Sequence, residues 1–189
     1  GGRIDVTSVP GEGSTFTCVL DLPMSHKQEP LANIDLRGCR MLIVDDDEVS
    51  RTILLEQLRL WDTRPEVVTR SEEAMPTLLK AVSAEPFEFV ITNSHMPGLS
   101  GDALGKAIRQ EPMLADIKLI MMTSTQERGD ASRLATIGFS GYLVKPAYQD
   151  DLRAVLEVVH AGTHREIVTR HSVSRGGQGP GSVLPETPP

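Results

Sequence analysis

The chain has 189 residues, of which 39% are hydrophobic and 24% are charged, and its net charge is −7. This composition is ordinary for a globular protein and argues against nucleic acid or an anionic membrane surface as a direct partner. No apolar run approaches the roughly 18 residues of a membrane-spanning helix, and no signal peptide is recognised, so a cytoplasmic location is expected. The sequence begins at Gly1 without a methionine, which suggests a piece of a longer protein.

Residues 1–23 contain the pattern of a β-hairpin. Strands are expected at residues 3–6 and 14–22, with Pro10-Gly11-Glu12-Gly13 as the turn between them. No Lys-Ser/Thr pair follows the glycines, so a phosphate-binding loop is not expected. Residues 24–37 are polar and lack periodicity, and they are predicted to form an interdomain linker.

From residue 38 to residue 161, strand-like and helix-like segments alternate five times, which predicts a parallel α/β sheet. Apolar runs predict strands at residues 41–44, 89–91, 119–122 and 142–144. Pro76 is expected near the start of the second helix, where proline is best tolerated. The residues expected to form the apolar faces of the five helices, and hence the core, are Leu54, Leu55, Leu58 and Trp61; Leu78, Leu79 and Val82; Leu104 and Ile108; Leu134 and Ile137; and Leu152, Val155, Leu156 and Val159.

Polar residues stand at the end of each of these four strands. Asp45 and Asp46 follow the first, Asn93 the second, Thr123 the third and Lys145 the fourth. Because the carboxyl ends of parallel strands meet at one edge of the sheet, we expect these side chains to converge. Each has an ordinary explanation by itself, such as acidic residues at a helix N-terminus. The agreement of four strand ends favours a functional site.

These residues, together with Ser94-His95-Met96-Pro97 and Gly141-Tyr142-Leu143-Val144-Lys145-Pro146, resemble the receiver (response regulator) domain of two-component signalling. The resemblance implies an α/β fold over residues 38–161. That fold is a doubly wound, flavodoxin-like (βα)5 domain with five parallel strands in the order 2-1-3-4-5. It also implies a cis peptide bond between Lys145 and Pro146.

The resemblance assigns a role to each residue of the site. It implies that Mg²⁺ is held by Asp45, Asp46, the side chain at position 93 and the backbone carbonyl of His95. Lys145 and Thr123 would contact a transferred phosphoryl group. Tyr142 would move with Thr123 and report the change to the face formed by the fourth helix, fifth strand and fifth helix.

The family's phosphoacceptor aspartate falls on Asn93, which is a departure from the pattern. A carboxamide has no anionic oxygen, so an acyl phosphate cannot form there. The loss of one negative charge should also weaken Mg²⁺ binding. Ser94 is expected to point away from the site, since side chains alternate across a strand, and it is a poor substitute acceptor.

The leading hypothesis is a non-phosphorylatable regulatory or docking receiver. Its expected partners are its own histidine-kinase core, another receiver or a histidine phosphotransfer domain, and the fourth-helix face could support a homodimer. The alternative is a normal Mg²⁺-dependent aspartyl-phosphate acceptor with an engineered Asp-to-Asn change at position 93. A distant alternative is a flavodoxin-like cofactor-binding domain, but the spacing of Gly98, Gly101 and Gly105 is wrong for a phosphate loop.

The flanking segments have resemblances of their own. Residues 3–8 and 11–16 look like the last hairpin of a histidine-kinase ATP-binding domain, which implies a hybrid sensor histidine kinase as the parent protein. Neither ATP binding nor enzyme activity is expected of this chain alone. Residues 162–189 are predicted to be a disordered tail, although residues 166–172 resemble the segment before a second receiver.

The histidines and cysteines give no metal signature. His160, His164 and His171 are interpreted as solvated tail histidines, because no carboxylate or cysteine joins them at useful spacing. Cys18 and Cys39 also lack metal-ligand spacing.

Overall fold

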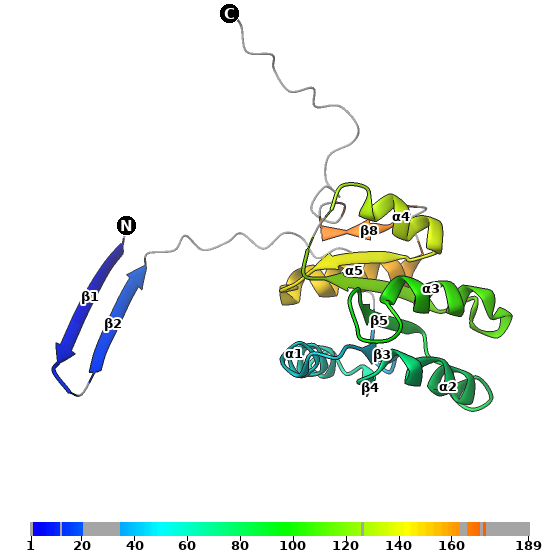
Figure 1. The fold of residues 1–189 in the computed structure, drawn as a ribbon, viewed down its shortest axis with the longest axis horizontal. Helices are drawn as coiled ribbons and strands as arrows, with labels where there is room; N and C mark the ends of the chain where they lie inside the picture. Colours follow the sequence, from blue (N-terminus) through cyan, green and yellow to red (C-terminus); the bar gives the residue numbers. More distant parts are fainter. Residues whose placement is uncertain are drawn as a thin grey trace, which may run out of the picture. The chain divides into compact units, whose positions relative to one another are not determined.

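Figure 1 shows the fold of the chain in a computed structural model. The structure describes residues 2–11, 13–20, 35–125, 127–162, 166–170 and 172. Most of the predicted linker and tail, and with them Glu12, His164 and His171, lie outside the described residues. The chain divides into two compact units, Gly1–Pro30 and Leu31–Pro189, and each is described by itself.

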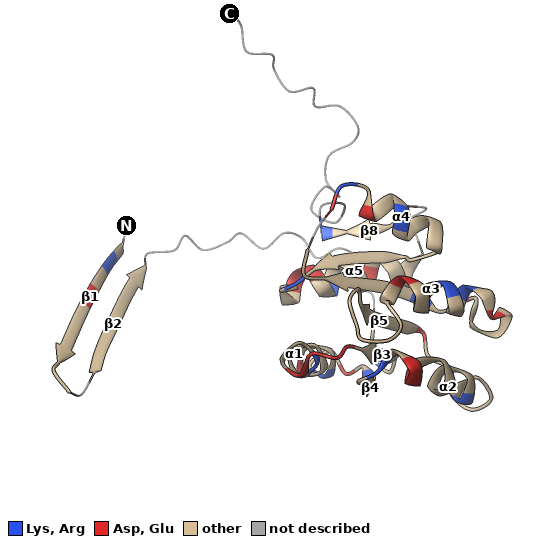
Figure 2. Cartoon of the chain, viewed as in Figure 1, with Lys and Arg blue, Asp and Glu red and all other residues tan. Residues whose placement is uncertain are grey.

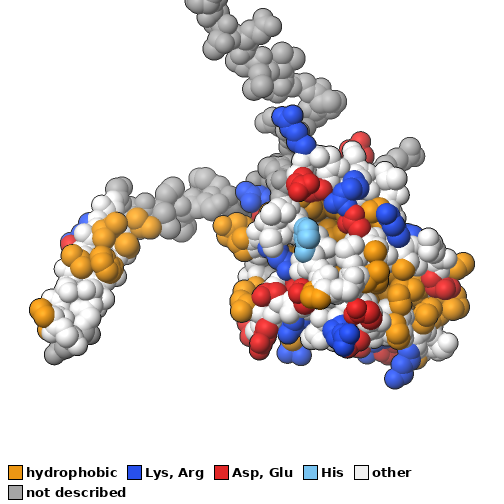
Figure 3. Space-filling view, viewed as in Figure 1, with side chains coloured by type: hydrophobic (Ala, Val, Ile, Leu, Met, Phe, Trp, Pro, Cys, Tyr) orange, Lys and Arg blue, Asp and Glu red, His pale blue; other side chains and the backbone are white. Residues whose placement is uncertain are grey.

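The first unit is a two-stranded antiparallel hairpin of β1 (Gly2–Val9) and β2 (Gly13–Leu20). The predicted hairpin is therefore confirmed. Every described residue of both strands is exposed, including Ile4 and Phe16, and Figure 3 shows hydrophobic side chains on the hairpin surface. A lone two-stranded ribbon is marginally stable at best in water.

The second unit is built on a six-stranded parallel sheet in the order β4-β3-β5-β6-β7-β8. The five strands from β3 to β7 have the predicted order 2-1-3-4-5, and the predicted fold class is confirmed. The inner strands are almost fully buried because helices cover both faces of the sheet. The strands are β3 (Arg40–Val44), β4 (Arg64–Val68), β5 (Phe89–Asn93), β6 (Lys118–Thr123), β7 (Gly141–Val144) and β8 (Val168–Thr169).

In the described part of the chain, five α-helices and one short 3-10 helix connect the strands. Side chains of α1 and α5 pack on one face of the sheet, and those of α2, α3 and α4 pack on the other, which gives two separate apolar cores. No helix in the described part of the chain is long and apolar enough to cross a membrane. The helices are α1 (Glu48–Arg59), α2 (Ser71–Val82), α3 (Gly101–Gln110), η1 (Pro112–Leu114), α4 (Asp130–Ile137) and α5 (Gln149–Ala161).

Two local features differ from the sequence predictions. Pro76 lies inside α2 and not near its start, because the helix already begins at Ser71. Trp61 lies beyond the end of α1, yet it is buried against the core with the apolar residues of that helix. Both differences concern where a helix begins or ends, which apolar spacing defines poorly.

A sixth strand, β8, adds to the five predicted strands, and it lies within residues 166–170 of the segment that was predicted to be a disordered tail. Val168 is 2% exposed and its N–H donates to the carbonyl oxygen of Ser140 at 2.9 Å. In the parallel register, Val168 is the partner of Gly141 and Thr169 is the partner of Tyr142. The free edge of β7 offers unpaired backbone groups, and the apolar Val168 side chain adds core contacts to this pairing.

Candidate functional site

The predicted acidic residues gather at the carboxyl end of β3, where Figure 2 colours acidic residues red along the loop that leads into α1. Asp45 is 2% exposed. Its Oδ2 accepts from Lys145 Nζ at 2.5 Å and from Ser50 Oγ at 2.9 Å, while its Oδ1 accepts from the Asp47 N–H at 3.0 Å. A buried carboxylate costs little when it is paired with a cation and fully hydrogen-bonded, as this one is.

The next two carboxylates have different surroundings. Asp46 is exposed, whereas Asp47 is the N-cap of α1 and accepts from the Ser50 N–H at 2.6 Å. Glu48 is in the first turn of the same helix, where negative charge is favourable. Asp47 and Glu48 are thus explained by their place at the helix N-terminus, and Asp45 and Asp46 remain as the acidic pair.

Lys145 reaches the acidic pair from the end of β7. Its backbone N–H donates to the Thr123 carbonyl at 2.7 Å, and the peptide bond to Pro146 is cis, as predicted. The Lys145 side chain is 15% exposed and that of Asp45 is 3% exposed, so their ion pair is largely removed from water. Two strand ends predicted to converge are thus joined by a direct contact.

Asn93 lies at the end of β5 and faces Asp46. Its Nδ2 donates to Asp46 Oδ1 at 3.2 Å and to the His95 carbonyl oxygen at 2.9 Å. A carboxylate and a carbonyl can only accept, so the carboxamide must present its NH₂ group to them. The amide hydrogens thus occupy Asp46 Oδ1 and the His95 carbonyl oxygen, two atoms that could otherwise bind a cation.

The loop after β5 fixes the backbone around Asn93. The Ser94 N–H donates to the Met122 carbonyl at 2.8 Å, and the Gly101 N–H donates to the Ser94 carbonyl at 3.1 Å. A Cβ on Gly101 would lie 2.4 Å from the Asn93 carbonyl oxygen, so only glycine allows this approach.

Thr123, at the end of β6, is bonded away from the acidic pair. Its hydroxyl donates to the Thr125 carbonyl at 2.9 Å and accepts from Ser94 Oγ at 3.0 Å. Ser94 Oγ also lies 2.8 Å from His95 Nδ1. The prediction that Ser94 points away from the site is therefore wrong with respect to Thr123, although no described contact joins Ser94 to the Asn93 carboxamide.

Tyr142 is buried beside α4. Its hydroxyl donates to Asp130 Oδ2 at 3.2 Å, and Asp130 also pairs with Arg133 at 2.9 Å. Burial, with the neighbouring Asp130 charge, raises the pKa of Tyr142 to about 12. Arg133 in turn pairs with Asp102 of α3, so a polar network connects Tyr142 to two helices.

The donor atoms at this site fit Mg²⁺ in kind. Asp45, Asp46 and the His95 carbonyl offer oxygen atoms, which this cation prefers. The Asn93 amide currently hydrogen-bonds two of these groups through nitrogen, and a cation would have to replace those hydrogen bonds. Asp45 and Asp46 with a neutral Asn93 carry one negative charge fewer than they would with an aspartate at position 93. We therefore expect a lower affinity for Mg²⁺.

The chain matches the response regulator receiver domain over residues 41–157, and it belongs to that family. Among curated relatives, it is 34% identical over 124 residues to the response regulator GacA of Pseudomonas protegens. That match covers 65% of this chain and 56% of GacA. It is also 26% identical over 195 residues to the sensor histidine kinase AruS of Pseudomonas aeruginosa, which covers 92% of this chain but 19% of AruS.

Solved structures show the same fold. The chemotaxis response regulator CheY4 of Vibrio cholerae matches with a TM-score of 0.59 at 24% identity, covering 65% of this chain and 98% of CheY4. The receiver domain of Ssk1 from Saccharomyces cerevisiae, solved together with the histidine phosphotransfer protein Ypd1, matches with a TM-score of 0.56 at 20% identity and covers 65% of this chain and 88% of that chain.

Several contacts at the site were not foreseen from the sequence. Ser50 and Asp130 are polar partners of Asp45 and Tyr142, and neither carries a local sequence signal for that role. The interpretation of His160 as a solvated tail histidine is wrong, because it lies in the last turn of α5 with its side chain only 26% exposed. Its neighbours Cys39 and Glu88 are distant in sequence, so spacing along the chain gave no sign of them.

Proposed function

We propose that this chain is a non-phosphorylatable receiver that works by docking to a partner. The observation that carries the proposal is the Asn93 carboxamide, which donates to Asp46 and to the His95 carbonyl. This position has no anionic oxygen to attack a phosphoryl group. Asp45 is nevertheless paired with Lys145, and Asp46 accepts from the Asn93 amide, so the site is held together without phosphoryl chemistry.

The parent protein is proposed to be a hybrid sensor histidine kinase. The match to AruS covers 92% of the chain, so it must extend on both sides of residues 41–157. The exposed hairpin of β1 and β2 then corresponds to the end of a kinase ATP-binding domain. A location in the cytoplasm and a role in a phosphorelay follow from this assignment.

A second candidate function is a normal aspartyl-phosphate acceptor whose aspartate has been replaced at position 93. It is favoured by the intact pair of Asp45 and Lys145, since an idle site has little reason to keep it. In that case Asp45, Asp46, position 93 and the His95 carbonyl would hold Mg²⁺. Thr123, Lys145 and Tyr142 would then take the roles that the family resemblance gives them.

The docking surface is proposed to be a groove beside the site. Val49 and Ile53 of α1 are 67% and 51% exposed, and they face the loop of Pro146 and Ala147 across the groove. The apolar lining and the neighbouring acidic residues suit an amphipathic helix with some basic side chains. The Ssk1 receiver was solved in complex with a histidine phosphotransfer protein, and we propose a partner of that class here.

A binding titration tests the docking proposal. The isotopically labelled chain would be titrated with a phosphorylated histidine phosphotransfer domain and, separately, with the histidine-bearing helices of a kinase core. We expect amide chemical shifts to change along α1 and around residues 145–147, while the partner keeps its phosphoryl group. Val49→Asp should weaken binding about tenfold or more, because it places a charge in the apolar groove.

Leu79→Asp is the matched control, since Leu79, although predicted for the core, is an exposed apolar residue on α2 that does not line the groove. Equal weakening by both variants, or shift changes that avoid α1, would contradict the assignment of this groove.

A further inference from the structure

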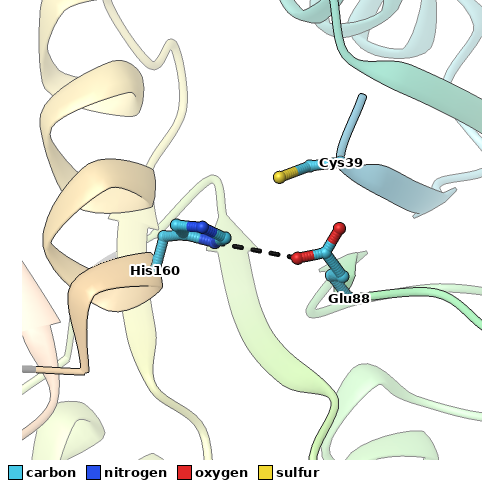
Figure 4. Close-up of side chains that lie close together, drawn as sticks. All are labelled: Cys39, Glu88 and His160. Atoms are coloured by element: carbon cyan, nitrogen blue, oxygen red, sulfur yellow. Dashed lines mark ion pairs between the residues drawn. The ribbon is translucent and has the colours of Figure 1, made fainter. Parts of the chain in front are cut away.

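Three side chains that the receiver site does not use come together at the amino ends of the strands. Cys39 precedes β3, Glu88 precedes β5, and His160 is in the last turn of α5. Figure 4 shows the thiol, the carboxylate and the imidazole pointing toward a common space. Their ligand atoms all lie within 4.8 Å of one another.

Backbone hydrogen bonds hold two of these residues in place. The Cys39 N–H donates to the Leu36 carbonyl at 3.1 Å. The Glu88 N–H donates to the Arg40 carbonyl, and the Glu88 carbonyl accepts from the Lys118 N–H, both at 2.9 Å. The backbone at these positions is therefore fixed before any ligand binds, which lowers the cost of assembling a site.

The imidazole is also held in place, but its inner nitrogen lacks a hydrogen bond. The His160 ring stacks on Phe89, with 6.0 Å between the ring centroids and 21° between the planes. His160 Nδ1 is buried without a hydrogen-bond partner in the described structure. Its distance of 3.8 Å to Glu88 Oε2 is too long for a hydrogen bond. A buried nitrogen without a partner costs free energy, which a bound cation would recover.

We propose that Cys39, Glu88 and His160 form a binding site for Zn²⁺ or a closely similar divalent transition-metal ion. Thiolate, imidazole and carboxylate are the ligands that Zn²⁺ uses, whereas Mg²⁺ and Ca²⁺ prefer oxygen atoms alone. Metal–ligand bonds of about 2.0 to 2.3 Å would require the three side chains to close in slightly.

The charges and the exposure of the cluster agree with this site. A thiolate and a carboxylate together neutralise a divalent cation, which suits a partly buried position. The Cys39 residue is 5% exposed, and the Glu88 side chain is 42% exposed. The site therefore opens to solvent on the Glu88 side, where water can fill the fourth position.

Without a metal, the thiol is protonated. Burial, together with the negative charge of Glu88, raises the pKa of Cys39 to about 11, and Lys118 opposes this effect only in part. Asp35 adds a weaker negative influence. Metal binding must displace this proton, so one proton from Cys39 should be released for each ion bound. If no metal binds, Cys39 remains a protonated thiol beside the Glu88 carboxylate and the His160 imidazole.

The test uses the whole chain with Zn²⁺ by calorimetry and Co²⁺ by absorbance, in buffer with excess Mg²⁺ to occupy oxygen-only sites. We expect one ion per chain, and a sulfur-to-cobalt charge-transfer band with the visible bands of a tetrahedral ion. Cys39→Ser and His160→Gln should each weaken Zn²⁺ binding about 100-fold or more, since even partners outside the ligand shell contribute 10- to 100-fold.

Two matched controls separate this site from the rest of the chain. Cys18→Ser and His164→Gln should bind Zn²⁺ as the unmodified chain does. Cys39 is then the only cysteine in the Cys18→Ser variant, so its cobalt charge-transfer band identifies the sulfur even if Cys39→Ser fails to fold. Absence of that band, or Zn²⁺ binding that a folded Cys39→Ser variant retains, would overturn the proposal.

Discussion

Lys145 Nζ lies 2.5 Å from Asp45 Oδ2, although the acceptor position beside them carries no charge. The pair therefore does not depend on a carboxylate at position 93. Asp45 is buried and would be costly as an isolated anion, so Lys145 stabilises the folded chain whether or not phosphoryl chemistry occurs. The contact between Lys145 and Asp45 is therefore compatible with an uncharged side chain at position 93.

Lys145→Met should destabilise the chain by about 3 kcal/mol, because it leaves a buried carboxylate without its cation. The cost should lie at the lower end for buried pairs, since Ser50 and the Asp47 N–H still donate to Asp45. Urea denaturation would measure the change in the free energy of unfolding.

Lys106→Met is the control for this variant, because Lys106 is an exposed lysine on α3. It should change the stability by less than about 0.5 kcal/mol. The double variant Asp45→Asn/Lys145→Met should be more stable than Lys145→Met alone. If the double variant loses as much stability as Lys145→Met alone, the broken ion pair is not the cause of the loss.

Asn93→Asp should reduce the stability of the chain by about 1 to 3 kcal/mol when Mg²⁺ is absent. The change removes two hydrogen bonds from Nδ2 and places a second carboxylate beside Asp46. Mg²⁺ should raise the Tm of the variant more than that of the unmodified chain, which thermal denaturation with and without the ion would measure. An equal Mg²⁺ response would show that position 93 does not control cation binding.

Tyr142 should ionise only near pH 12. The folded-state pKa lies above the ordinary value of about 10, so the stabilisation by the neutral phenol is complete below pH 10. It is then lost as the pH rises through about 12. The pKa of Tyr142 would be measured by titrating the absorbance of the unmodified chain and subtracting the curve of the Tyr142→Phe variant. A midpoint near 10 would mean that the phenol is not buried against Asp130.

The strand β8 should contribute to stability and should keep the edge of β7 from pairing with other chains. Val168→Ala should cost about 1 to 2 kcal/mol from lost apolar burial, whereas Val49→Ala, at an exposed position, should cost little. A chain ending at residue 162 should self-associate through the uncovered edge of β7, as measured by analytical ultracentrifugation. A chain ending at residue 172 keeps β8 and should behave as the full chain does. Equal association of both would contradict this role.

Much of the fold was predictable because the inner strands are continuous apolar runs. Residues 41–44 and 89–91 have no polar interruption, and they are buried on both faces as such runs should be. The convergence of Asp45, Asn93 and Lys145 followed from the rule that strand ends meet at one edge of a parallel sheet.

The remaining features depend on contacts that local patterns do not encode. The position of β4 was not predicted from the sequence, because this edge strand contains Pro65 and alternating exposed residues and so has no continuous apolar run. β8 has two residues and forms only because β7 offers a free edge. The partners of Tyr142 and His160 come from other elements, so their sequence neighbours gave no information about them.

Intact-mass analysis after incubation with Mg²⁺ and a small acyl-phosphate donor tests the central claim most directly, with Asn93→Asp treated alongside. The account predicts that the unmodified chain gains no mass, and that the variant gains one phosphoryl group because Asp45, Lys145 and Thr123 remain in place. A phosphoryl group on the unmodified chain would contradict the claim that Asn93 silences this receiver.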